Sequence, residues 1–123
     1  MNENQSRAFA REVALARRLM QQGDFDRAFG HLERAHVLGQ ERVVPHALSH
    51  WLMLRIAIHR GEPFAVLGQA ARIALGSLGS ALGFVPTGNT GGTNLSMFAR
   101  LDIDPELAAI MEGRPTDAAV PPC

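Results

Sequence analysis

Turn-forming glycines and prolines divide this chain into segments, each with the 3.6-residue apolar periodicity of an α-helix. In the first segment Phe9, Val13 and Ala16 recur every three or four positions, while arginines take the other faces. Helices are expected to end near Gln22, Gly39, Gly61 and Leu82, and a short fifth helix should follow the capping sequence Asp104-Pro105-Glu106. The sequence therefore predicts an all-α fold.

Residues 15–35 fit the tetratricopeptide pattern, with small residues and leucines on both helices and a glycine turn at Gly23. A degraded copy follows, and its turn glycine, Gly61, lies 38 residues (61 − 23) after the first. We therefore predict two antiparallel helical hairpins of tetratricopeptide-like form, a glycine-rich loop and a short C-terminal helix. Two repeats are fewer than the usual three, so the loop and the last helix should cover exposed core.

The length of 123 residues suits one domain, which we place at residues 7–112 between a flexible N-terminus (1–6) and a disordered tail (113–123). Twelve basic residues balance twelve acidic ones, which gives no electrostatic reason to expect nucleic-acid binding. No signal peptide or membrane span is expected, and Cys123 alone cannot form an internal disulfide. A bacterial cytoplasmic protein is the default interpretation.

Four of the five histidines fall within 20 residues, at the junction of the second and third predicted helices. His46 and His50 are four residues apart and so share one helix face, which also carries buried apolar positions. Because consecutive antiparallel helices place the end of one beside the start of the next, His36 should lie near both. The sequence thus predicts three imidazoles on the inner side of a helix junction.

Two carboxylates are candidates to complete a metal site with these imidazoles. Glu33 lies one turn before His36, and Glu12 falls inside the apolar stripe of the first helix. Glu-x-x-His and His-x-x-x-His spacings occur in the metal sites of helical bundles, because both side chains leave the same face. We therefore predict a transition-metal site with His36, His46, His50, Glu33 and Glu12 as ligands, for iron or zinc before copper.

The same residues allow other interpretations. The histidines could form a structural network, in which Glu12 and Glu33 pair with arginines such as Arg34 or Arg72, or could act as bare catalytic side chains. If the network is structural, the protein would be a small interaction adaptor that binds a protein partner or a second copy on its helical surface. The sequence does not determine whether the protein is an enzyme.

The glycine-rich loop at residues 86–96 is long for a compact helical domain. It could hold an anion on its backbone amides, act as a lid, or bond to its own Asn and Thr side chains as an irregular connection. Just before it, glycines at positions 76, 79 and 83 give the fourth helix one thin face. That face indicates either close packing of a neighbour or an early end of the helix.

The sequences HLERAHVLGQ, HALSHW and VPTGNTGGTN together resemble a family of short bacterial proteins catalogued as domain of unknown function 3703. The resemblance covers roughly residues 9–107 and rests on three separate motifs. It implies no established activity and so assigns no catalytic residue.

Overall fold

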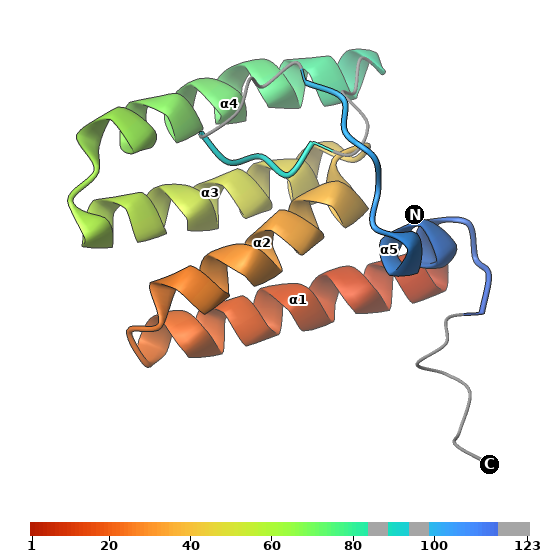
Figure 1. The fold of residues 1–123 in the computed structure, drawn as a ribbon. Coiled ribbons are helices and arrows are strands. Elements are labelled where there is room, and N and C mark those ends of the chain that lie inside the picture. The colour runs from red at the N-terminus through yellow and green to blue at the C-terminus, as the bar shows by residue number, and fades with distance from the viewer. Residues whose placement is uncertain (84–88, 94–98, 116–123) are drawn as a thin grey trace.

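The computed structural model describes residues 1–83, 89–93 and 99–115 of the chain. These residues form five α-helices and, within those ranges, no strand: α1 (Glu3–Gln21), α2 (Phe25–Gly39), α3 (Val43–Arg60), α4 (Pro63–Leu82) and α5 (Pro105–Met111). The first four run back and forth in chain order, and α1 packs against α2 as α3 packs against α4 (Figure 1). The predicted all-α fold and its two helical hairpins are confirmed.

The first helix begins at Glu3 and not at Arg7, so residues 3–6 are its first turn and not a flexible N-terminus. The cause is a capping box that the sequence analysis missed. The Asn2 side chain accepts a hydrogen bond from the Gln5 amide at 2.8 Å, and Gln5 reaches back to the Asn2 amide at 3.4 Å. Asn2 also donates to the carbonyls of Ile110 and Met111 at the end of α5, which ties the two termini of the domain together.

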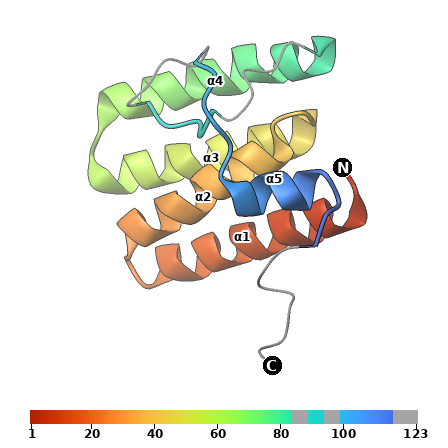
Figure 2. The ribbon, with the colours of Figure 1, turned by 45° about the vertical axis from the view of Figure 1, so that its right-hand side comes forward.

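The apolar core lies between α1, α2 and α3, where Leu32, Leu38, Leu52 and Ile56 are fully buried. The short helix α5, which Asp104 caps as predicted, adds Leu107 and Ile110 to this core. It lies against the N-terminal half of α1 (Figure 2). The C-terminal helix therefore covers core surface as expected. The rest of the predicted tail, residues 116–123, lies outside the described residues.

The fourth helix contributes no apolar side chain to the core, because its two buried residues are Gln69 and Ser80. It continues to Leu82 and ends at Gly83, whose φ of 81° is the left-handed conformation that glycine adopts at helix ends. The glycine at position 76 therefore does not terminate the helix early. Instead, the thin face of α4 packs against α3, on the side where the histidines lie.

Candidate metal centre

Three imidazoles meet at the junction of α2 and α3. The Nε2 atom of His50 lies 3.0 Å from Nε2 of His36 and 3.1 Å from Nε2 of His46. All three ligand atoms lie within 4.8 Å of one another. Nitrogens bound to a tetrahedral zinc ion at 2.0–2.1 Å would be about 3.3 Å apart, close to the two distances from His50. The predicted convergence of His36, His46 and His50 is confirmed.

Each imidazole directs its other nitrogen to an oxygen acceptor. Nδ1 of His36 lies 2.6 Å from the carbonyl oxygen of Asn89, which can only accept, so this nitrogen carries the proton. Nδ1 of His50 lies 2.6 Å from Oε1 of Gln69. The Gln69 amide nitrogen faces the carbonyl of Gly91 at 3.0 Å and the Met53 sulfur at 3.5 Å, which fixes the oxygen towards His50.

The third imidazole has a comparable partner. Nδ1 of His46 lies 2.5 Å from Oγ of Ser80, and that hydroxyl donates its own proton to the carbonyl of Gln40 at 2.8 Å. The serine oxygen must therefore accept from His46. Because every Nδ1 carries the proton, a neutral imidazole leaves its Nε2 lone pair free. The network orients three lone pairs towards one point.

The three rings are almost completely shielded from solvent, with relative exposures of 3 % for His36, 6 % for His46 and 2 % for His50. Burial lowers the pKa of all three, and it lowers the pKa of His50 to about 4. The imidazoles are therefore neutral near pH 7. When each ring carries its proton on Nδ1, no hydrogen lies between the neighbouring Nε2 atoms. The Nε2 lone pairs then face one another and repel unless a cation lies between them.

Two glycines allow close approach to the rings. A Cβ on Gly76 of α4 would lie 2.9 Å from Cε1 of His46, and a Cβ on Gly91 would lie 2.7 Å from Cδ2 of His36. The thin face of α4 therefore allows close packing against His46, as one of the two interpretations of the glycines predicted. Gly91 belongs to the described part of the glycine-rich loop, which closes over the imidazoles. Residues 86–88 and 94–96 of that loop lie outside the described residues.

The structure does not bring Glu12 to the three imidazoles. The carboxylate of Glu12 is buried, but its oxygens lie 2.6 Å from Nδ1 of His31 and 2.9 Å from Nε of Arg34. Both partners lie three residues apart on α2, on the side that faces α1. The prediction of Glu12 as a ligand is therefore replaced by the ion pair with Arg34 that the alternative interpretation anticipated.

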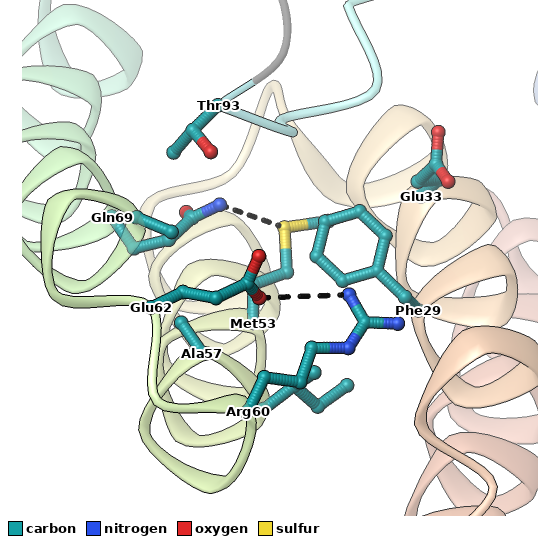
Figure 3. A pocket seen from close by; sticks show the side chains of 10 residues that line it. Phe29, Glu33, Met53, Ala57, Arg60, Glu62, Gln69 and Thr93 are labelled. Carbon is teal, nitrogen blue, oxygen red and sulfur yellow. Dashed lines mark hydrogen bonds and ion pairs between the residues drawn. The ribbon is translucent and has the colours of Figure 1, made fainter.

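Glu33 also stays outside the group of ligand atoms that the described residues form. Burial raises its pKa, and the neighbouring Thr90 side chain opposes that rise. Glu33 lines a cavity of about 290 Å³ between α2, α3 and α4. Figure 3 shows Gln69 and Met53 joined by a hydrogen bond at the wall of this cavity, and Arg60 paired with Glu62 at the same cavity. The cavity therefore adjoins the hydrogen-bond network of the histidines through Gln69.

The remaining histidines are separate from the cluster. His31 pairs with the Glu12 carboxylate. His59 is exposed and stacks on Phe25 with 5.2 Å between ring centroids. Three groups that orient the imidazoles were not predicted from the sequence: Gln69, Ser80 and the Asn89 carbonyl. The glycines at 76 and in the loop were the only signals pointing to those places.

The comparisons with known proteins support a family assignment and no activity. No curated protein and no solved structure matches the chain. A family model described as protein of unknown function (DUF3703) matches residues 3–111, which include all three imidazoles of the cluster and every residue that orients them. The chain belongs to this family of proteins of unknown function, DUF3703.

Proposed function

We propose that this protein binds one transition-metal ion, zinc before other metals, through Nε2 of His36, His46 and His50. The observation that carries the proposal is the orientation of the three Nδ1 protons onto fixed oxygen acceptors. Metal-binding histidines almost always donate their second ring proton in this way, because the bond fixes the tautomer and the ring orientation. A set of three histidines holding zinc with a fourth position left over is a known type of zinc site.

The donor set favours zinc over iron. Non-haem iron sites commonly combine two histidines with a carboxylate, and neither Glu12 nor Glu33 joins the described cluster. Three neutral imidazoles suit Zn²⁺ and also copper, which generally binds nitrogen ligands more tightly in solution. Copper therefore becomes the second candidate, and iron, which the sequence placed ahead of copper, becomes the third.

Because the centre is buried, it is better suited to holding an ion than to catalysis on a large substrate. All three ligands are at most 6 % exposed, and Gly76 and Gly91 lie directly against two of the rings. A role in metal handling follows from this closure. Chemistry at the ion would be restricted to ligands of the size of water.

The alternative is an adaptor in which the imidazoles only stabilise the fold. It predicts a metal-free protein that also takes up no added zinc. The test is elemental analysis of protein purified without a histidine tag or chelator, before and after incubation with zinc. The proposal expects one equivalent of zinc, lost in a His46→Ala/His50→Ala variant and kept in His59→Ala. Circular dichroism shows whether each variant is folded.

A further inference from the structure

The helix α4 has the reverse of the usual polarity of a surface helix. Its inner side carries Gln69 and Ser80, which bond to the histidines, while every exposed residue of α4 is apolar. Phe64 is 87 % exposed and Leu82 is 76 % exposed, at opposite ends of the helix. A helix on the outside of a monomer normally turns its apolar stripe inward. The outer side of α4 therefore has the character of a contact surface for another molecule.

The exposed apolar residues form one continuous stripe. Its members follow one another at intervals of three or four residues, as positions on one helix face do: Phe64, Leu67, Ala71, Leu75, Leu78 and Leu82. The single charged residue of α4, Arg72, is half-buried and donates to the Gly68 carbonyl at 3.3 Å. The stripe therefore carries no charge that would repel an identical surface.

The stripe is also nearly symmetric about residue 73. Phe64 and Leu82 are each nine positions from it, Leu67 and Leu78 are six and five away, and Ala71 and Leu75 are each two away. Two such helices in antiparallel orientation place each residue opposite its symmetry mate, and the small Ala71 faces the larger Leu75 of the other copy. A two-fold interface requires this kind of self-complementary pattern.

We propose that this protein forms a homodimer in which the stripe on α4 packs antiparallel against the same stripe of a second copy. In a repeat fold, the last hairpin exposes the surface on which a next repeat would stack. The stripe lies on that last hairpin, and the second copy takes the place of the missing repeat. The inference does not depend on metal binding.

A membrane surface fits the stripe less well. The helix α4 is long and apolar enough to be a candidate membrane span, which the sequence analysis did not anticipate. However, Gln69 and Ser80 of this helix bond to His50 and His46 within the fold. Helices that lie on membranes carry basic residues along their polar face, and α4 has only Arg72, on its inner side.

The test is the molar mass of the full chain in solution, measured by sedimentation equilibrium. Wild-type protein is expected at twice the 13.3 kDa chain mass. Leu67→Glu and Leu78→Glu are each expected at the chain mass, because each buries two unpaired carboxylates in the symmetric interface. The double variant L67R/L78E is expected to dimerise again, because antiparallel pairing sets arginine against glutamate twice.

The matched control is Ile58→Glu on α3, because Ile58 and Leu78 are both 58 % exposed. This variant is expected to remain dimeric. A monomeric wild type, a dimer insensitive to both α4 charges, or a dimer that only Ile58→Glu dissociates would each overturn the proposal. Failure of L67R/L78E to reassemble would overturn the antiparallel arrangement. Co-sedimentation of a monomeric wild type with phosphatidylglycerol vesicles, lost in Leu67→Glu, would assign the stripe to a membrane.

Discussion

Nδ1 of His36 lies 2.6 Å from the carbonyl oxygen of Asn89, although 53 residues separate them in the chain. This bond joins the helix junction to the glycine-rich loop, and Asn89 is itself 1 % exposed. The Asn89 side chain accepts from the Gly91 amide at 2.9 Å and so shapes the turn that lies against the His36 ring. The loop therefore forms part of the imidazole cluster and is not only a connection.

Replacing Gly76 by alanine should weaken zinc binding without unfolding the protein. The added Cβ would lie 2.9 Å from Cε1 of His46, so the ring must shift away from its position. We expect a loss of about tenfold in zinc affinity, the lower end of the effects seen when the support of a metal ligand is altered. Competition titration with a zinc chelator measures it.

The control for this variant is Gly30→Ala on α2, where nothing lies within 4 Å of the added Cβ. Alanine in a helix interior is more stable than glycine by about 0.5–1 kcal/mol, so Gly30→Ala should stabilise the fold and leave zinc affinity unchanged. Equal zinc affinity of Gly76→Ala and Gly30→Ala would contradict the close packing of α4 on His46.

Removing the hydroxyl of Ser80 should lower zinc affinity through His46. Ser80→Ala deprives Nδ1 of His46 of its acceptor and removes the hydrogen bond from the serine hydroxyl to the Gln40 carbonyl. Loss of such an orienting partner typically costs 10–100-fold in metal affinity, and we expect about tenfold here. Ser77→Ala, on the same helix, is the control and should bind zinc as the wild type does. No difference between the two serine variants would remove Ser80 from the centre.

Replacing Glu12 by glutamine should destabilise the fold and leave the metal site intact. The buried carboxylate holds both His31 and Arg34, but these partners are partly exposed and can be rehydrated. We therefore expect a loss of about 1–3 kcal/mol in the free energy of unfolding, measured by urea denaturation. The zinc content should stay at one equivalent. Loss of zinc from a folded Glu12→Gln protein would restore Glu12 as a ligand.

Acidification should destabilise the metal-free protein. The pKa of each clustered histidine is lower in the folded state than in the unfolded chain, so their contribution to stability is present above about pH 6.5 and is lost as the pH falls. With a folded pKa of about 4, His50 alone should account for about 2 kcal/mol between pH 7 and pH 5. Urea denaturation across this range checks the slope, and His50→Gln should flatten it. An unchanged slope in that variant would contradict the shift.

Helical periodicity was enough to predict that the imidazoles of His36, His46 and His50 meet. His46 and His50 share a face of α3, and a short turn places the end of α2 beside them. The orienting groups could not be predicted in this way, because Gln69, Ser80 and Asn89 come from a later helix and a loop. The positions of Gln69 and Ser80 depend on how α4 packs against α3, and the position of Asn89 depends on the path of the loop.

The carboxylates show a different limit of sequence reasoning. The apolar stripe of α1 correctly placed Glu12 inside the domain, since Glu12 is buried. It could not decide between the imidazole cluster and the side chains on α2 that face α1, because the rotation of α2 against α1 determines which of them faces Glu12. The structure resolves this in favour of His31 and Arg34. The first turn of α1 was missed because its cap, Asn2, lies among polar residues without apolar periodicity.

X-ray absorption at the zinc edge, on protein loaded with one equivalent of zinc, tests the central claim most directly. The account predicts three imidazole nitrogens at about 2.0–2.1 Å and one further light ligand. The imidazole signal should persist in His59→Ala and be lost in His50→Ala. Zinc that is surrounded only by oxygen ligands, or that keeps its imidazoles in His50→Ala, would contradict a centre built from His36, His46 and His50.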